Sequence, residues 1–417
     1  MSDFSQNGII STLHDFGTKS LEQIEKELLG FSKERKMELI LPCLYSELKG
    51  DALPKIVEEI SKTNYIHHII IGLDQASEAQ ARKAWTFFEK LETPFTILWN
   101  DGPNLKKLDK ELQKKGLAPN EYGKGRNVWY CIGMSIARDS ARSVALHDCD
   151  IKTYDRRMLA KLFYPVVNPL FNFEFCKGFY PRVADNKMNG RVARLLVFPL
   201  LNALEKTIGK SDYLDFMKSF KYPLAGEFSF RRNILPELRI SSDWGIEIGI
   251  LSEMQRNFSP QNICQVDLAD TYDHKHQDLS LDDEKKGLSR MSIDIIKTFI
   301  KKLATQGHSF SREQLRSLKA TYYRSALDLI DAYRADAEIN GLKFDSHTEE
   351  KAVELFSSNI IKAGEDFYLN PMDAPFIPTW SRVKSAIPDL LIRLEKAVNE
   401  DNKYYLCLLY TSPSPRD

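Results

Sequence analysis

The sequence predicts an α/β protein with a mostly parallel β-sheet flanked by helices, followed by an α-helical C-terminal region. Two observations indicate this class. Short apolar runs alternate with amphipathic segments over the first third of the chain, a pattern typical of βαβ units. Beyond residue 280, apolar side chains recur at helical spacing with charged faces between them.

The predicted strands share a buried apolar run that ends in polar or breaker residues. They lie at residues 37–48, 65–74, 94–101 and 143–150, and we expect Pro42 to break the first of them. Helices are predicted between them, at residues 20–34, 52–63, 77–91 and 123–140. Ligands of open α/β sheets gather at the carboxyl ends of the strands. The segments LPCLYSE, GLDQAS, WNDGPN and HDCD should therefore face one crevice.

Changes in pattern divide the chain into five predicted parts. They are an N-terminal helical segment (1–35), an α/β half (36–155), a second half of mixed strands and helices (156–283), a helical C-terminal region (284–402) and an appended or artefactual tail (403–417). The C-terminal helices are predicted at residues 283–306, 311–338, 349–367 and 380–400.

Composition excludes several classes of protein. Lys+Arg and Asp+Glu number 58 each, so nucleic acid and anionic membranes are poor partners. No apolar run is long enough to span a bilayer, and the N-terminus does not resemble a secretory signal. The six cysteines show no CxxC pair, which indicates reduced thiols in a cytoplasmic protein.

Two short motifs contain residues suited to binding a metal ion. In HDCD, Asp148 and Asp150 follow an apolar run and can converge on Mg²⁺ or Mn²⁺ if the chain turns there. In DHKHQ, His274 and His276 follow a second strand-like stretch, and imidazole binds Mn²⁺-type ions. A solvated turn explains the first motif equally well, and surface histidines explain the second.

Two glycine-containing motifs suit an anion. GKGR opens a helix, so Lys124 or Arg126 and the helix N-terminus could hold a phosphate. NGRVAR contains Gly190 and Arg191, and arginine suits bidentate contact with phosphate or carboxylate. The alternatives are a basic turn and a surface hairpin. Glu227 and Glu247 could hold sugar hydroxyls or form salt bridges.

Taken in order, these motifs resemble those of the glucosyl-3-phosphoglycerate synthases, retaining glycosyltransferases of family 81 with the GT-A fold. The resemblance covers residues 35–300 and is most specific in PLAGE, GIEIGIL and the stretch from QVDL to DHKH. It implies transfer of glucose from UDP- or GDP-glucose to 3-phosphoglycerate, with Mg²⁺ or Mn²⁺ as cofactor. It also implies a homodimer, and it makes residues 36–155 the nucleotide-sugar-binding half and residues 156–283 the acceptor-binding half.

The resemblance implies a role for each matching donor-site residue. Asp148 lies near the ribose, Asp150 and His274 hold the cation, and Lys124 contacts the nucleotide or its diphosphate. The further donor contacts are Pro42, Glu47, Asp74 and Glu247. The family usually has an asparagine–glutamate pair where this chain has LYSE, which leaves the uracil contacts open.

The resemblance also implies the acceptor site and the chemistry. Gly190 and Arg191 form the acceptor-phosphate turn, and Ala193 stands where the family has a hydroxyl residue. His276 replaces an amide of the family. Leu224, with the backbone up to Gly226, lies beside the anomeric carbon, and Glu247 holds the glucose hydroxyls. The acceptor attacks on the face from which the diphosphate departs.

Three other functions compete with this one. A mannosylglycerate-type synthase would use GDP-mannose with glycerate or phosphoglycerate, and Ala193 and LYSE keep it open. A sugar-phosphate nucleotidyltransferase should have a Gly-rich signature near its N-terminus, which LPCLYSELKG lacks. A non-catalytic scaffold would have no need to retain Asp148, Asp150 and His274 together.

Overall fold

The structure is a computed structural model that describes residues 6, 8–274, 287–371 and 376–410. It divides into two compact units. We call one the sheet unit (Asp15–Cys176, Gly226–Ser242 and Phe376–Asp417) and the other the helical unit (Met1–His14, Lys177–Ala225 and Asp243–Pro375).

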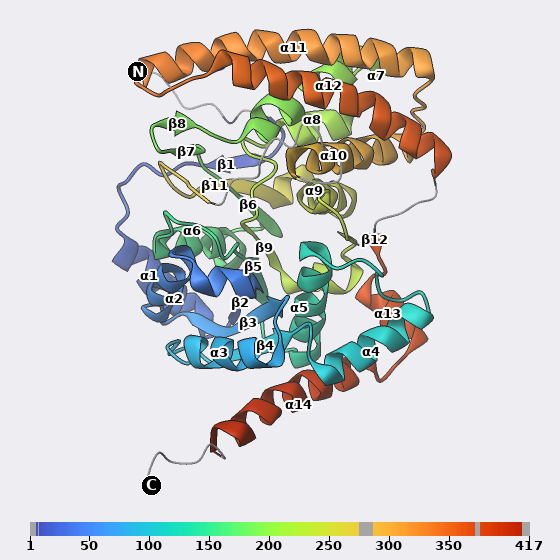
Figure 1. Cartoon of the computed structure of the whole chain (residues 1–417). Helices are drawn as coiled ribbons and strands as arrows, with labels where there is room; N and C mark the ends of the chain where they lie inside the picture. The colour runs from blue at the N-terminus through green and yellow to red at the C-terminus, as the bar shows by residue number, and fades with distance from the viewer. Residues whose placement is uncertain (1–5, 7, 275–286, 372–375, 411–417) are drawn as a thin grey trace. The chain divides into compact units, whose positions relative to one another are not determined.

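The sheet unit is built on five strands in the order β9-β5-β2-β3-β4. The four strands β5, β2, β3 and β4 are parallel, and β9 joins them antiparallel at β5. Their bounds are β2 (Met37–Leu44), β3 (Ile66–Asp74), β4 (Phe95–Trp99), β5 (Ser143–Leu146) and β9 (Phe228–Arg231). The predicted parallel α/β sheet is therefore confirmed (Figure 1).

The strands of this unit are apolar along their length because helices cover both faces of a parallel sheet. Leu39, Ile40 and Leu41 of β2 are all buried, and so are Ile69 and Ile70 of β3. The helices of the unit are α1 (Leu21–Ser32), α2 (Ala52–Ser61), α3 (Glu78–Phe88), α4 (Pro103–Lys114), α5 (Lys124–Arg138), α6 (Arg156–Val167), α13 (Trp380–Ala386) and α14 (Leu390–Tyr410), with short 3₁₀ turns η1 (Tyr45–Lys49) and η3 (Arg232–Glu237).

The expectation that Pro42 breaks its strand is wrong. β2 runs unbroken from Met37 to Leu44, and Pro42 pairs with Gly72 of β3. On the opposite side the ladder with β5 ends at Ile40, so the missing N–H of Pro42 lies beyond the last paired residue.

The helical unit contains short strands and helices from both the middle and the C-terminal part of the chain. Its strands are β1 (Ser11–Leu13), β7 (Val183–Ala184), β8 (Lys187–Met188) and β11 (Ile263–Asp267); β6 (Phe175–Phe179) starts in the sheet unit and continues here. Its helices are η2 (a π-helix, Val192–Val197), α7 (Phe198–Ile208), α8 (Asp212–Lys218), α9 (Ile246–Asn257), η4 (a 3₁₀ turn, Pro260–Asn262), α10 (Gly287–Ala304), α11 (Arg312–Ile339) and α12 (Ser346–Leu369).

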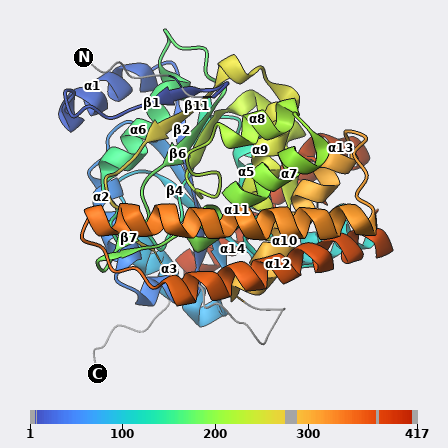
Figure 2. The ribbon, with the colours of Figure 1, turned by 90° about the horizontal axis from the view of Figure 1, so that it is seen from above.

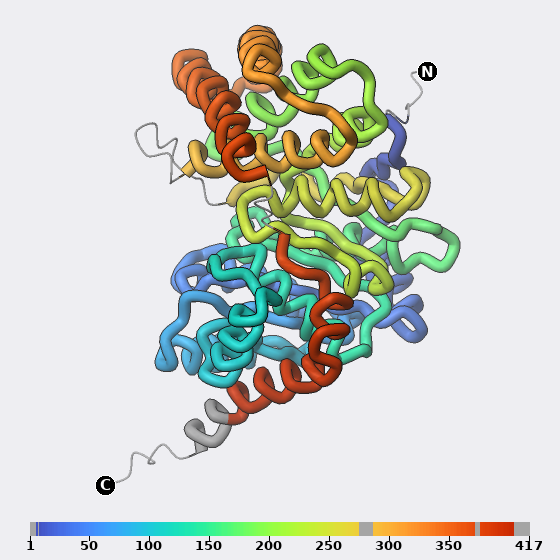
Figure 3. The backbone as a smooth tube through the Cα atoms, turned by 90° about the vertical axis from the view of Figure 1, so that its right-hand side faces the viewer, coloured from blue at the N-terminus to red at the C-terminus, as the bar shows by residue number. Residues whose placement is uncertain are grey.

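The C-terminal region is helical, as predicted, and its helices are shared between the units. In the helical unit, α11 and α12 pack side by side (Figure 2). The chain then returns to the sheet unit, where β12 (Phe376–Ile377) pairs with β10 (Ile240–Ser241) and α14 packs on α4 and α5 (Figure 3). Among the described residues, no helix combines the length and apolarity needed to cross a bilayer.

Candidate functional site

The polar segments after β2, β3, β4 and β5 lie at one edge of the sheet. These strands are parallel, and their register aligns Leu44 with Asp74 and Leu73 with Trp99. Their carboxyl ends therefore point the same way, and the ligand sites of open α/β sheets are found at this edge.

Lys124 and Asp148 form an ion pair within the sheet unit. Lys124 is the first residue of α5, and its Nζ lies 2.7 Å from Oδ1 and 3.0 Å from Oδ2 of Asp148, just past β5. Both side chains are partly exposed, at 32% and 27%. The structure thus brings together the two residues that the sequence assigns to the diphosphate and the ribose.

Gly226 is needed for the position of Asp148. A Cβ built on Gly226 would lie only 2.2 Å from Oδ2 and 2.7 Å from Cγ of Asp148. Any side chain at position 226 would push this carboxylate away, so the glycine of PLAGE permits a close approach to the acidic turn.

The other charged residue of GKGR has a structural role. Arg126 is buried, and its Nη2 lies 2.9 Å from Oδ2 of Asp109 on α4. The hydroxyl of Tyr130 donates to Oδ1 of the same carboxylate at 2.6 Å, and the Tyr122 ring covers the guanidinium at 4.5 Å. Of the two residues considered for a phosphate, Lys124 is the one beside the acidic turn.

The histidine of HDCD belongs to the core. His147 is fully buried against Tyr154, with ring centroids 5.6 Å apart, and burial lowers its pKa to about 3. It is therefore neutral at physiological pH. Asp150, two residues after Asp148, is partly exposed.

Asp74, predicted to contact the base, ends β3 and is buried. Burial raises the pKa of its carboxyl above the ordinary value, and the backbone N–H of Gln75, which donates to Oδ1 at 3.0 Å, opposes this shift. Gln75 adopts a positive φ of 55°, an unfavourable conformation that is often found at functional sites.

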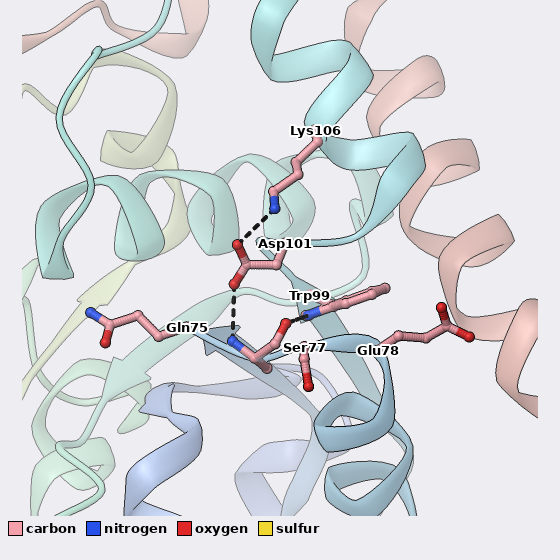
Figure 4. A pocket seen from close by; sticks show the side chains of 7 residues that line it. Gln75, Ser77, Glu78, Trp99, Asp101 and Lys106 are labelled. Carbon is pink, nitrogen blue, oxygen red and sulfur yellow. Dashed lines mark hydrogen bonds and ion pairs between the residues drawn. The ribbon is translucent and has the colours of Figure 1, made fainter.

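A pocket of about 380 Å³ lies directly after Asp74 (Figure 4). Trp99 donates from Nε1 to the carbonyl of Ala76 at 2.9 Å, and Asp101 accepts from the N–H of Ala76 at 3.0 Å. Lys106 pairs with Asp101 at 3.0 Å. Sequence reasoning assigned none of these three side chains, although it predicts that WNDGPN lies at this edge.

The other predicted base contacts lie around the end of β2. Pro42 is partly exposed within the strand, and Glu47 lies in the 3₁₀ turn η1 that follows it. The hydroxyl of Ser46 donates to Oε1 of Glu47 at 3.4 Å.

The predicted acceptor turn lies in the helical unit. Gly190 has a positive φ of 75°, which glycine adopts without strain. The following Arg191 donates from Nε to Oε1 of Glu349 on α12 at 2.6 Å. The side chain of Ala193 is buried in the π-helix η2, so an acceptor could contact this position only through the backbone.

The PLAGE segment is held by a lysine that sequence reasoning missed. Lys177 of β6 is fully buried, and its Nζ donates to the carbonyl of Ala225 at 2.5 Å. Leu224, the residue before Ala225, is partly exposed. A lysine inside an apolar strand is rare without a partner, so KGFYPR carried a signal that could have identified this residue.

Glu247 and His274 are on other elements of the helical unit. Glu247 lies in the first turn of α9 and is 7% exposed, beside the more exposed Trp244. His274 follows β11 and lies edge-on to Tyr272, with ring centroids 5.7 Å apart. His276 lies outside the described residues.

Arg182 is a second residue that sequence reasoning did not assign. Its Nη1 donates to the hydroxyl of Tyr222 at 3.0 Å, and its guanidinium lies 5.6 Å from the centre of the Tyr272 ring. A Cβ at Gly190 would come within 3.3 Å of its side chain. Arg182 therefore adds a positive charge next to the acceptor turn.

The residues proposed to bind the metal belong to different units, Asp150 to the sheet unit and His274 to the helical unit. Within the described parts of the chain, no three His, Cys, Asp or Glu side chains gather as a complete metal site. A carboxylate and an imidazole are donors that suit an ion such as Mg²⁺ or Mn²⁺, which completes its shell with water and substrate phosphates.

Comparisons with known proteins identify the family. The chain is 42% identical over 402 residues to the glucosyl-3-phosphoglycerate synthase of Persephonella marina. The aligned region covers 96% of this chain and 99% of that protein. It is 38% identical over 407 residues to the enzyme of the same name from Methanococcoides burtonii, with coverage of 97% and 99%. No protein-family model matches the sequence.

A solved structure supports the fold. The glucosyl-3-phosphoglycerate synthase of Mycobacterium tuberculosis matches with a TM-score of 0.51 and 21% identity, over 70% of this chain and 87% of that chain. The fold is GT-A, as the sequence resemblance implied. The chain belongs to the glucosyl-3-phosphoglycerate synthase family of hexosyltransferases.

Proposed function

We propose that this enzyme transfers glucose from UDP-glucose to 3-phosphoglycerate with retention of configuration at the anomeric carbon. The observation that carries the proposal is the 42% identity to a named glucosyl-3-phosphoglycerate synthase over 96% of the chain. Structures of the mycobacterial enzyme contain Mn²⁺ with UDP-glucose and phosphoglyceric acid, or Mn²⁺ with UDP and glucosyl-3-phosphoglycerate. These complexes favour a uridine donor over a guanosine donor.

The ion pair between Lys124 and Asp148 supports the proposed donor site. Lys124 brings one positive charge to the carboxyl edge of the sheet, where a departing diphosphate builds negative charge. The resemblance assigns the cation to Asp150, two residues past Asp148, together with His274. Bound Mg²⁺ or Mn²⁺ would supply Lewis-acid stabilisation of the leaving phosphate.

The remaining groups in this proposal bind the glucose and hold the backbone next to it. Glu247 accepts hydrogen bonds from the glucose hydroxyls, and the backbone from Leu224 to Gly226 lies beside the anomeric carbon. Lys177 fixes that backbone through the carbonyl of Ala225. The acceptor hydroxyl attacks on the face from which the diphosphate leaves, and a leaving-phosphate oxygen accepts its proton.

The acceptor is held by positive charge. We assign its phosphate to the turn at Gly190 and Arg191, since an arginine guanidinium binds phosphate through two parallel hydrogen bonds. The contact predicted for His276 remains part of this proposal.

The proposal is tested by identifying the product. The purified enzyme is incubated with Mg²⁺ or Mn²⁺ and either UDP-glucose or GDP-mannose, each with 3-phosphoglycerate and with D-glycerate, followed by mass spectrometry. We expect glucosyl-3-phosphoglycerate from the first donor and the phosphorylated acceptor. A mannosylated product formed at a higher rate would establish the mannosylglycerate-type activity instead.

The metal ligands are tested separately. Asp150→Ala and His274→Ala should each abolish turnover at saturating Mg²⁺ or Mn²⁺. Asp270→Ala, which changes an exposed aspartate four positions before His274 in the sequence, should retain it. Near-normal rates in a folded Asp150→Ala or His274→Ala variant would contradict the assignment.

Two further expectations belong to the proposal. The described cysteines, Cys43, Cys131, Cys149, Cys176 and Cys264, are all buried thiols, which supports a working location in the reducing cytoplasm. We also expect a homodimer, which light scattering at several protein concentrations will test.

A further inference from the structure

The acceptor turn is contacted by a buried carboxylate from the C-terminal helices. Glu349 of α12 is 3% exposed and binds two arginines that flank the start of η2. Its Oε1 accepts from Nε of Arg191 at 2.6 Å, and its Oε2 accepts from Nη2 of Arg194 at 2.9 Å. One carboxylate thus joins the predicted phosphate-binding arginine to a second arginine.

Arg194 connects this pair to the backbone of the turn. Its Nε donates to the carbonyl of Asn189 at 2.8 Å, and its Nη2 donates to that of Met188 at 3.3 Å. The guanidinium also lies over the ring of Tyr333 on α11, 4.8 Å from the ring centre. The backbone before Gly190, the two arginines and both helices therefore form one connected network.

Two backbone-directed contacts attach the same helices to neighbouring parts of this segment. The N–H of Lys343, between α11 and α12, donates to the carbonyl of Asn186 at 2.8 Å. The hydroxyl of Tyr322 on α11 donates to the carbonyl of Leu195 in η2 at 2.6 Å. The helix pair is thus fixed to the acceptor segment on both sides of Arg191.

The geometry indicates that Glu349 orients Arg191 for an anion and does not block its guanidinium. Glu349 contacts Arg191 at Nε, and an arginine has two further nitrogens with which to bind an anion. The side chain of Arg191 is 35% exposed, whereas that of Glu349 is 4% exposed, so Arg191 stays accessible while the carboxylate that holds it is buried. With two arginines and one carboxylate, the cluster keeps a net positive charge for a phosphate.

We infer that Glu349 is a positioning residue that fixes the guanidinium of Arg191 for the anionic group of the acceptor, so that the C-terminal helices determine acceptor affinity. This inference rests on the proposed function, because Arg191 must be the residue that binds the acceptor. An ordered guanidinium loses less conformational entropy when it binds, which lowers the acceptor concentration needed for half-saturation.

The test compares Glu349→Gln with Glu350→Gln, an exposed neighbour on the same helix that loses the same charge. We expect Glu349→Gln to raise KM for 3-phosphoglycerate about tenfold, as loss of a charge-assisted hydrogen bond would, with kcat and KM for UDP-glucose unchanged. Glu350→Gln should leave all three unchanged. Glu349→Asp keeps the buried charge but shortens the side chain. This variant should therefore fold and should also raise KM for 3-phosphoglycerate.

A double-mutant cycle separates positioning from general support of the fold. If Glu349 acts through Arg191, then Glu349→Gln should change KM for the acceptor less than about twofold in an Arg191→Ala background. An equal effect in both backgrounds, or an unchanged or lower KM in folded Glu349→Gln and Glu349→Asp, would overturn the inference. If Arg191→Ala alone leaves KM for the acceptor unchanged, the proposed acceptor site itself is wrong.

Discussion

Replacing Gly226 by alanine should disable the donor site without unfolding the protein. The new methyl carbon would lie 2.2 Å from Oδ2 and 2.7 Å from Cγ of Asp148, far inside ordinary contact at 3.4 Å. The atoms that it meets belong to the end of a flexible side chain, so Asp148 will rotate away while the backbone stays in place. This movement separates the carboxylate from Nζ of Lys124, which it now contacts at 2.7 Å.

The size of the effect follows from the displacement. To restore contact at 3.4 Å from 2.2 Å, Oδ2 must retreat by about 1.2 Å, and misplacement of a site group by about 1 Å costs on the order of 100-fold in rate. We therefore expect kcat/KM for UDP-glucose to fall about 100-fold. The free energy of unfolding should change by less than about 1 kcal/mol, because the clash is relieved without moving the backbone.

The assay is initial-rate kinetics with varied UDP-glucose at saturating Mg²⁺ and 3-phosphoglycerate, alongside urea unfolding. Gly30→Ala is the matched control, because Gly30 is in the last turn of α1 and a Cβ added there would have no neighbouring atom within 4 Å. It should leave the kinetics unchanged and raise stability by roughly 0.5–1 kcal/mol. A folded Gly226→Ala variant with normal kcat/KM would refute the placement of Asp148 in the donor site.

Two further predictions concern buried carboxylates. Asp401→Ala removes an acceptor for the backbone N–H groups of Asn104 (3.1 Å) and Leu105 (3.0 Å) at the start of α4, so urea unfolding should show a loss of about 2 kcal/mol. Glu400→Ala, the exposed neighbouring control, should change stability little, and an equal loss in both variants would contradict this capping role. The pKa of Asp294 is raised from 3.8 to about 6, first by burial and then by the negative charge of Asp243. The protonated carboxyl therefore favours the folded state at low pH, and this contribution to stability is lost as the pH rises from about 4 to 6. Asp294→Asn should therefore match the wild type near pH 4 and exceed it by about 3 kcal/mol above pH 6, and a stability difference that does not vary with pH would disprove the shift.

The strands and the local part of the site could be predicted because their signals are short-range. A parallel strand covered on both faces must be apolar along its length, so β2, β3 and β5 are visible in the sequence. Gly123 indicates the start of α5 at Lys124, and HDCD directly follows the buried β5. Each of these signals lies within a few residues of the feature that it predicts.

Pro42 shows where a local rule fails. Proline is unfavourable in a central strand because it cannot donate to the ladder, and β2 is central. The cost depends on how far the neighbouring strand extends, and β5 ends its pairing at Ile40. That length is a property of another segment of the chain, so the sequence around Pro42 does not contain it.

The contacts missed in the site are those between distant segments. Glu349 lies 158 residues from Arg191, and Lys177 lies 48 residues from Ala225. In the sequence, Glu349 is one of two adjacent glutamates in a helix with charged faces, and nothing distinguishes it from Glu350. Only burial in the folded unit separates them, since Glu349 is 3% exposed and Glu350 is on the exposed side.

The C-terminal helices carry no recognisable motif, yet each unit uses one of them in the same way. In the helical unit, Glu349 of α12 holds Arg191 and Arg194 at the start of η2. In the sheet unit, Asp401 of α14 caps α4, the helix that follows β4 and carries Lys106 of the pocket. A buried carboxylate is costly unless its oxygens are satisfied, so each helix is fixed in place by the donors that it meets. The same requirement fixes those donors, which are the backbone N–H groups at the start of α4 and the two arginines at the start of η2. Under the proposed function, α12 therefore sets acceptor affinity by ordering the turn at Arg191.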